Sequence, residues 1–301
     1  MAKQRVLITG ASGQLGQALL LRVNLDTVEV LTPDRASFNL SEPEQCAAFV
    51  RSNRPDWIIN AGAYTAVDRA ESEPELAFRV NSQAPAALAA ALSDHGGRMI
   101  QISTDFVFGG EQPIPYQPLD ATHPLGVYGQ SKREGELAVL NALAGSGRCQ
   151  VVRTSWLHGP SGHNFVITML RLQRSHAPEQ HPIRVVADQI GSPTHTWGLA
   201  EFCWQLVHTA STPAECVLHW ADAGVASWFD FAVAVAELGE ALGLIPQKAP
   251  VVPITTKEYP TAAQRPHFSV LGGCGMAGLP QPQHWRLGLQ HTLAALVGER
   301  A

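Results

Sequence analysis

The stretch with the clearest chemistry is Tyr128-Gly-Gln-Ser-Lys132, which places an amine four residues after a phenol. On a helix the two side chains share one face. An isolated tyrosine has a pKa of about 10, which makes it a poor acid–base group at neutral pH, and a nearby lysine ammonium is expected to lower that pKa. Such a pair exchanges a proton with an alcohol or ketone oxygen, while the lysine also reaches ribose hydroxyls. The alternative is an exposed helical pair without a catalytic role.

A second polar group precedes this pair by 24 residues, where Ser103-Thr104-Asp105 ends an apolar stretch that reads as a strand. Ligands of open α/β sheets lie at the carboxyl ends of the strands. Thr104 is therefore placed to hydrogen-bond the reacting oxygen beside Tyr128. The alternative for Thr104 is a strand-end residue bonded to nearby backbone, and Asp105 equally fits a turn cap.

A glycine-rich turn opens the chain, in the stretch Val6-Leu-Ile-Thr-Gly10-Ala-Ser-Gly13-Gln-Leu-Gly16. Its G-x-x-G-x-x-G pattern lies between a strand and a helix, as dinucleotide binding requires. A pyrophosphate needs close backbone approach, free N–H groups and the positive end of a helix. The sequence therefore predicts cofactor contacts at Gly10, Ser12, Gly13, Gln14, Leu15 and Gly16.

The choice between NADH and NADPH depends on the end of the second strand. An acid there holds the ribose 2′-hydroxyl of NAD, whereas an arginine accepts the 2′-phosphate of NADP. This chain has Asp34 and Arg35 side by side, which favours NADP or use of both cofactors. We also expect Asn39 and Leu40 to border the adenine, and the small residues after the third strand to lie against the cofactor, namely Ala61, Gly62 and Ala63.

A scaffold must position these groups. In the first half of the chain, short apolar stretches alternate with segments that have the hydrophobic periodicity of helices. Continuous apolar stretches predict strands that are buried on both faces. The β-α-β order predicts a Rossmann-like, doubly wound parallel sheet with helices on both faces. The predicted strands are Val6–Thr9, Val28–Leu31, Trp57–Asn60, Met99–Ser103 and Val151–Thr154. The predicted helices are Leu15–Arg22, Glu42–Ser52, Leu76–Ser93 and Tyr128–Leu143.

The pattern becomes irregular after about residue 160. We expect helices at Phe165–Gln173 and Trp197–Thr209, strands at Arg184–Ala187 and near Val217–Ala221, and an N-cap at Ser227. We therefore predict a cofactor domain over residues 1–160, with a later strand and helix from about 184 to 221. Residues 161–301 would form most of a smaller, interleaved substrate-binding portion.

Composition excludes several classes of protein. The 301 residues carry a net charge of 21 − 26 = −5, which argues against a nucleic-acid binder that depends on phosphate contacts. No stretch approaches the roughly 18 apolar residues of a membrane span. The five cysteines are scattered, without a C-x-x-C pair, so neither a disulfide framework nor a zinc site is indicated. We expect a cytoplasmic protein.

Taken together, the motifs resemble the extended short-chain dehydrogenase/reductase superfamily. The resemblance rests on the glycine turn, Asn60–Glu71, Ser103–Gly110 and the Tyr128/Lys132 pair. Further motifs narrow it to the dTDP-4-dehydrorhamnose reductase family: Arg153-Thr-Ser-Trp156, Asp188–Thr194, Ser227-Trp-Phe-Asp-Phe231 and Arg265–Leu271.

This resemblance implies reduction of the C4 ketone of dTDP-4-dehydro-β-L-rhamnose by NADPH or NADH, in dTDP-rhamnose and cell-surface polysaccharide biosynthesis. Tyr128 would donate the proton, Lys132 would tune it and bind the nicotinamide ribose, and Thr104 would complete the hydrogen bonds to the ketone oxygen. The sugar nucleotide would contact Tyr64, Thr65, Val67, Asp105, Phe106 and Trp156. Arg265 either pairs with a substrate phosphate or pins the C-terminal segment.

Two departures from the family pattern stand out. Phe106 replaces a tyrosine that many members have, which removes a hydroxyl from the pocket. Some members carry a carboxylate after the glycine turn that is associated with Mg²⁺ at a dimer contact, but Gln17-Ala-Leu19 offers none. We therefore expect no metal, and a homodimer stays open. Two other functions also stay open: an epimerase or dehydratase that retains NAD, and a non-catalytic nucleotide-binding regulatory subunit.

Overall fold

A computed structural model describes residues 3–179, 181–209, 215–275 and 281–298. Its central sheet has six parallel strands in the order β10-β5-β4-β3-β1-β2 within these residues. The strands are β1 (Gln4–Thr9), β2 (Val28–Leu31), β3 (Trp57–Asn60), β4 (Arg98–Thr104), β5 (Cys149–Thr154) and β10 (Val217–His219). The Rossmann-like α/β architecture is thus confirmed, and β1 to β5 all lie where the sequence predicts them.

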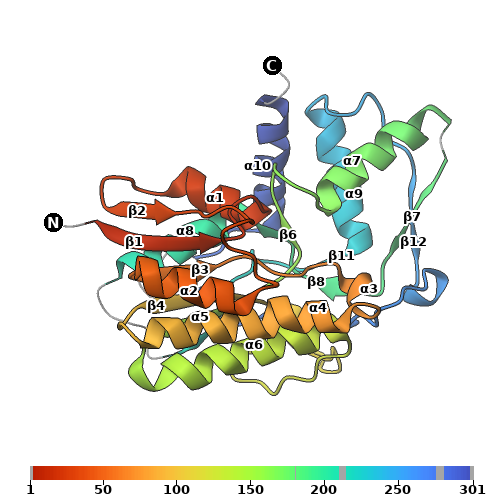
Figure 1. Cartoon of the computed structure of the whole chain (residues 1–301). Coiled ribbons are helices and arrows are strands. Elements are labelled where there is room, and N and C mark those ends of the chain that lie inside the picture. Colours follow the sequence, from red (N-terminus) through yellow and green to blue (C-terminus); the bar gives the residue numbers. More distant parts are fainter. Residues whose placement is uncertain (1–2, 180, 210–214, 276–280, 299–301) are drawn as a thin grey trace.

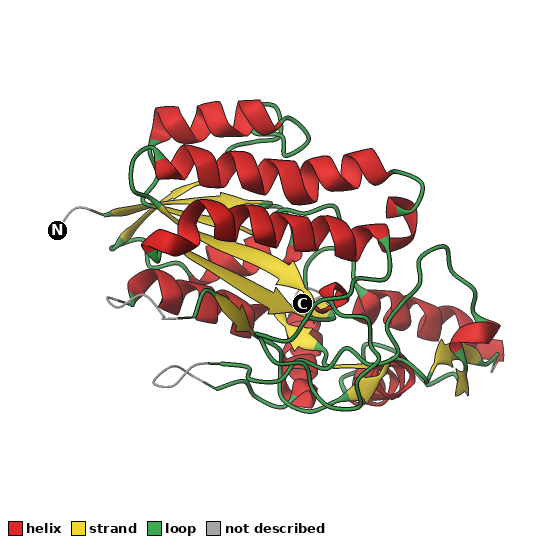
Figure 2. Cartoon of the chain, turned by 90° about the horizontal axis from the view of Figure 1, so that it is seen from below, coloured by secondary structure: helices red, strands yellow, loops and turns green. Residues whose placement is uncertain are grey.

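Helices cover both faces of this sheet (Figure 1). On one face lie α1 (Gln14–Arg22) and α8 (Thr196–His208). On the other lie α2 (Pro43–Asn53), α5 (Ala84–Ser93) and α6 (Val127–Leu143), and Figure 2 shows helices side by side across the sheet. Alternate residues of β1 explain both cores, because Val6 and Ile8 join the first and Leu7 joins the second. This is the pattern of a strand that is buried on both faces.

The predicted helix Leu76–Ser93 is confirmed as a continuous helical segment over residues 74–93, but it contains a π turn that the sequence did not predict. The segment forms α4 (Pro74–Phe78), the π-helical turn η1 (Arg79–Gln83) and then α5. Pro85 has no backbone N–H, so it cannot bond the Asn81 carbonyl four residues earlier. The backbone takes a wider turn instead, in which the Ala84 N–H bonds the Arg79 carbonyl. Single π turns of this kind are frequent at functional sites.

The second half builds a separate core from α7 (Phe165–His176), α9 (Trp228–Ala241) and α10 (Trp285–Gly298). Ser227 caps α9 as predicted, in a capping box with Asp230. The strand predicted at Arg184–Ala187 is β7 (Ile183–Val186), which pairs with β12 (Val251–Ile254) outside the central sheet. Two-stranded pairs also join β8 (Ile190–Gly191) with β11 (Ala226–Ser227), and β6 (Leu157–His158) with β9 (Thr194–His195).

The remaining described elements are short. They are α3 (Val67–Ala70) and the single turns η2 (Asp105–Val107), η3 (Ala144–Ser146), η4 (Ala177–Glu179) and η5 (Thr256–Glu258). Of these, α3 and η2 matter most for function, because both follow the carboxyl ends of central strands. In a sheet of this strand order, ligands bind outside the carboxyl ends of β1 and β3, where the chain direction of the connections reverses.

None of the helices in the described residues is both long and apolar enough to span a bilayer.

Candidate active site

The predicted phosphate-binding turn lies between β1 and α1. Gly10 has φ +63°, and a Cβ there would lie 2.6 Å from the Gly62 Cα. A Cβ on Gly16 would lie 2.2 Å from the Gly10 carbonyl oxygen. Both positions therefore need glycine for close approach of backbone to backbone. Gly13 is the N-cap of α1 and supplies no side-chain cap, so the first turn of this helix keeps N–H groups for an anion.

A buried chain of hydrogen bonds fixes the strand ends beneath this turn. The Thr9 hydroxyl bonds Asn60 Oδ1 at 2.5 Å, and Asn60 Nδ2 donates to Gln101 Oε1 at 2.7 Å. The Gly62 backbone N–H donates to Thr9 Oγ1 at 3.0 Å. These contacts join β1, β3 and β4 and fix the position of residues 61–63 relative to the three strands. Sequence reasoning missed Gln101, although a glutamine inside an apolar strand was the available signal.

The residues after β2 form a turn of their own. The Asp34 carboxylate accepts the backbone N–H of Ser37 at 2.9 Å and its hydroxyl at 2.7 Å, and these bonds lower its pKa. Arg35 is exposed beside it. Leu40 approaches the glycine turn, because a Cβ on Gly62 would lie 2.5 Å from Leu40 Cδ1. Asn39 instead caps a local turn by accepting the Ser41 N–H.

The predicted catalytic residues come together from two elements. Thr104 ends β4, and Tyr128 and Lys132 lie on the first turns of α6. The Thr104 side chain lies close enough to the Tyr128 phenol to influence its pKa. Lys132 is 4% exposed and donates from Nζ to the Ile102 carbonyl at 2.7 Å. The reacting groups thus meet at the carboxyl end of the sheet, as expected from the strand order.

The expected lowering of the Tyr128 pKa is wrong for this structure. Burial raises the pKa of Tyr128 to about 12, the bond with Thr104 opposes the shift, and the charge of Asp105 adds to it. Burial lowers the pKa of Lys132 to about 8, against the attraction of Glu136. The Lys132 amine donates to the Ile102 carbonyl rather than to the phenol. The effect of burial on the Tyr128 pKa therefore outweighs any stabilisation of the phenolate by Lys132. A raised pKa keeps Tyr128 protonated at neutral pH, which is the form that a proton donor needs.

Asp105 is buried beside Thr104. It is 2% exposed, and its Oδ1 accepts the Thr104 hydroxyl proton at 3.1 Å. Burial raises the pKa of Asp105 to about 6, opposed by hydrogen bonds with Ser269 and Thr104. The Thr104 oxygen in turn accepts the Phe106 backbone N–H at 3.2 Å, so Thr104 is also bonded to the nearby backbone, as its alternative reading expected. Asp105 therefore orients Thr104.

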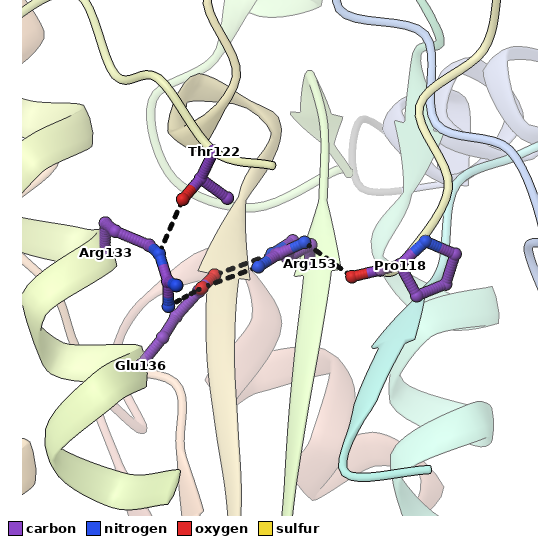
Figure 3. A network of polar contacts seen from close by, with 5 residues as sticks. All are labelled: Pro118, Thr122, Arg133, Glu136 and Arg153. Carbon is purple, nitrogen blue, oxygen red and sulfur yellow. Dashed lines mark hydrogen bonds and ion pairs between the residues drawn. The ribbon is translucent and has the colours of Figure 1, made fainter. Parts of the chain in front are cut away.

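A buried ionic network anchors the helix that carries Tyr128 and Lys132. Glu136, one turn after Lys132, takes two hydrogen bonds from Arg153 on β5, at 2.9 and 2.8 Å. Arg133 also contacts Glu136 at 3.3 Å and bonds Thr122 (Figure 3). Arg153 further donates to the Pro118 carbonyl at 3.1 Å. This network fixes α6 against β5 and against the segment 118–122.

A small hollow, with a volume of about 10 Å³, adjoins Tyr128. Two residues expected at the substrate site, Val67 and Phe106, line it together with Tyr128. The rings of Phe106 and Tyr128 meet edge to face, with centroids 5.7 Å apart. Glu71 and Gln264 also line the hollow. Sequence reasoning did not assign a role to either, although Glu71 ends the motif Asn60–Glu71 and Gln264 directly precedes the motif that begins at Arg265.

The other expected substrate residues differ in their surroundings. Thr65 is exposed. The Tyr64 hydroxyl donates to Glu73 at 2.7 Å. Of the two alternatives for Arg265, the structure places it against a carboxylate of this chain, because its guanidinium makes two bonds to Asp68, at 3.1 and 2.7 Å. Arg265 thus pins the C-terminal segment to α3.

Trp156 follows β5 in a left-handed conformation, with φ +46°, which is rare for a bulky side chain. Its indole stacks on Trp228, with centroids 3.6 Å apart and planes at 6°. The opposite side lies against Gly191, where a Cβ would be 2.6 Å from the indole. Both faces of the Trp156 ring are therefore covered, which leaves its edge for a ligand. It does not line the hollow beside Tyr128.

Asn81, in the π turn η1, was missed by sequence reasoning. It is 1% exposed, accepts the Tyr64 N–H, and donates to the Tyr64 carbonyl and to Ser131 next to Lys132. A Cβ on Gly135 would lie 2.0 Å from the Asn81 carbonyl, so α6 packs directly on this turn. The available sequence signal was Pro85. It lacks the N–H that would bond the Asn81 carbonyl in an α-helix, which favours a π turn at this point.

No group of three or more metal-ligating side chains occurs in the described part of the chain. The absence of a metal stays a prediction.

Comparison with known proteins supports the family that the sequence motifs suggest. Residues 4–297 match the family described as RmlD substrate binding domain. The chain is 38% identical over 296 residues to the dTDP-4-dehydrorhamnose reductase of Aggregatibacter actinomycetemcomitans, covering 96% of this chain and 98% of that relative. It is 40% identical over 299 residues to the enzyme of that name from Mycolicibacterium smegmatis, covering 98% and 86%.

A solved structure agrees over the whole length. The crystal structure of dTDP-4-dehydrorhamnose reductase from Bacillus anthracis in complex with NADP has a TM-score of 0.87 and 35% sequence identity, covering 98% of this chain and 100% of that one. The chain therefore belongs to the dTDP-4-dehydrorhamnose reductase family, within the extended short-chain dehydrogenase/reductase superfamily.

Proposed function

We propose that this protein reduces the C4 ketone of dTDP-4-dehydro-β-L-rhamnose to the C4 alcohol of dTDP-β-L-rhamnose, with NADPH or NADH as hydride donor. The reaction serves dTDP-rhamnose supply for cell-surface polysaccharides. Membership of the family supports the substrate. One observation carries the chemistry: Thr104 at the end of β4 lies close to Tyr128 on α6, and Lys132 is buried one turn further along α6.

The residues divide the work of the reaction. The nicotinamide, when bound, supplies a hydride to C4, and the protein supplies orientation and a proton. Tyr128 donates its hydroxyl proton to the C4 oxygen as negative charge develops there. Thr104 holds that oxygen in position beside the phenol. One hydride and one proton together convert the ketone to the alcohol.

Cofactor binding begins at the glycine turn. Its unpaired N–H groups and the positive end of α1 suit the pyrophosphate. Gly10, Ser12, Gly13, Gln14, Leu15 and Gly16 form this contact in the proposal, and Ala61, Gly62 and Ala63 lie against the nucleotide. Lys132 then holds the nicotinamide ribose. The site of the dTDP-sugar includes Val67, Phe106 and the edge of Trp156.

We assign NADPH as the preferred cofactor. Arg35 is exposed after β2, whereas Asp34 is occupied by its two bonds to Ser37, so the arginine is the freer partner for a 2′-phosphate. Arg35→Ala should raise the KM for NADPH about tenfold and leave that for NADH within about twofold. An equal change for both cofactors would contradict the assignment.

The test of the function is cofactor consumption with dTDP-4-dehydro-β-L-rhamnose. A reductase consumes one NADPH for each dTDP-rhamnose formed. An epimerase or dehydratase with tightly held NAD returns the hydride, so cofactor would copurify without net oxidation. A non-catalytic regulatory subunit would bind nucleotide and show no turnover at any cofactor ratio. Either of the last two results would reject the proposal.

Assembly and location complete the proposal. We place the activity in the cytoplasm, which cell fractionation checks. A homodimer is the assembly to test, by sedimentation of the purified protein with and without Mg²⁺.

A further inference from the structure

The helix that carries Tyr128 lacks an N-terminal cap of its own. Gly126 is the N-cap of α6 and has no side chain to offer. The cap comes from far along the chain instead, because Glu71 Oε1 accepts the Val127 backbone N–H at 2.9 Å. Val127 is the first residue of α6, and Tyr128 is the next. A carboxylate at this position satisfies an otherwise unpaired N–H and favours the helix dipole.

The first turn of α6 is also confined by close approach. A Cβ on Gly126 would lie 2.6 Å from Glu71 Oε1, and a Cβ on Gly129 would lie 2.3 Å from the Phe106 carbonyl oxygen. Glycine at both positions lets the turn that bears Tyr128 lie directly against Glu71 and against η2. The position of the phenol therefore depends on these two contacts.

Glu71 lies in a short segment, residues 67–71, that connects three parts of the site. It directly follows α3, on which Asp68 makes two bonds to Arg265. Val67, next to Asp68, and Gln264, next to Arg265, line the same hollow as Tyr128. Asp68 thus binds the C-terminal segment through Arg265, and Glu71 binds the first residue of α6.

We propose that Glu71 is a positioning residue for Tyr128. Its carboxylate holds the Val127 N–H and thereby fixes how far the phenol reaches into the hollow. Glu71 transfers no proton in this account, because its Oε1 is engaged with a backbone amide. The inference concerns the geometry of proton donation and so rests on the proposed reductase function. Small displacements of a catalytic group lower kcat strongly, whereas the glycine turn and cofactor binding should be unaffected.

Three variants test the role by kinetics. Glu71→Ala removes the acceptor, and we expect kcat to fall about tenfold with the KM for NADPH unchanged. Glu71→Gln keeps an amide oxygen for the Val127 N–H and should recover most of the kcat that the alanine variant loses. Glu75→Ala is the matched control, since Glu75 is an exposed glutamate on the nearby helix α4. Wild-type kcat in Glu71→Ala, or no recovery in Glu71→Gln, would overturn the proposal.

A readout without turnover separates this inference from the proposed function. Amide hydrogen exchange over residues 124–132 should be faster in Glu71→Ala than in the wild type, and unchanged in Glu75→Ala. Unchanged exchange in Glu71→Ala would overturn the capping role, even in a fully active enzyme. If the wild type does not reduce the ketone but exchange responds as expected, the reductase function fails and the capping contact stands.

Discussion

At the scale of single residues, burial decides the protonation states on which the chemistry depends. Tyr128 keeps its proton because its pKa is raised, and Lys132 is easier to deprotonate because its pKa is lowered. The four-residue spacing predicted that these two side chains share one face of a helix. It could not predict the sign of the shift at Tyr128, because the desolvation of a side chain depends on packing from distant segments.

The lowered pKa of Lys132 predicts a pH dependence. Its amine is protonated below a pKa of about 8 and neutral above it, and the charged form is the one that binds ribose hydroxyls and favours the phenolate left after proton transfer. The kcat/KM for ketone reduction should therefore fall as pH rises through about 8, and Lys132→Met should abolish this limb together with most activity. A wild-type rate that stays level well above this pH would contradict the role of the lysine.

At the scale of elements, local motifs were predictable and contacts between distant segments were not. The β1–α1 turn was predictable because its glycines recur every third residue, and two of them, Gly10 and Gly16, are required by a close approach nearby. The carboxylate cap of α6 was not, since Glu71 precedes Val127 by 56 residues. The π turn after Phe78 follows from Pro85 and was overlooked because alanine-rich periodicity dominates the segment.

The glycine turn gives a prediction at this scale. Gly10→Ala introduces a side chain at φ +63° and 2.6 Å from the Gly62 Cα, so β1 and the segment after β3 must move apart. We expect NADPH binding to weaken at least about tenfold, since displaced N–H groups no longer meet the pyrophosphate. Gly145→Ala is the control, because a Cβ there meets nothing within 4 Å. Equal affinity of Gly10→Ala and the wild type, measured by fluorescence titration, would refute this.

At the scale of the whole molecule, two differently built parts flank one site. The central sheet has long, buried strands whose apolar residues made them recognisable. The second part uses two-residue strands such as β8 and β11, and parallel pairing of β7 with β12 across more than sixty residues. The two-residue strands are too short to leave a periodic signal, so sequence reasoning recovered β7 and the helices of this part but not its short strand pairs.

The ionic network of Glu136 and Arg153 gives a prediction for global stability. Both side chains are buried, with exposures of 0% and 3%, and they join α6 to β5. Glu136→Gln leaves Arg153 without its charge partner in the interior, so we expect a loss of about 3–5 kcal/mol in unfolding free energy. The paired change Glu136→Leu with Arg153→Met should recover much of it. Denaturant unfolding measures both, and equal stability of Glu136→Gln and wild type would contradict this reading.

The central claim is that the Tyr128 hydroxyl supplies the proton to the C4 oxygen. The direct measurement is NADPH oxidation with dTDP-4-dehydro-β-L-rhamnose by the wild type and by Tyr128→Phe, alongside the dissociation constant for NADPH. The account predicts a kcat lower by a factor of about 10²–10⁴ in the variant, with cofactor affinity within about twofold. Undiminished turnover by Tyr128→Phe, or a loss explained wholly by weaker cofactor binding, would contradict it.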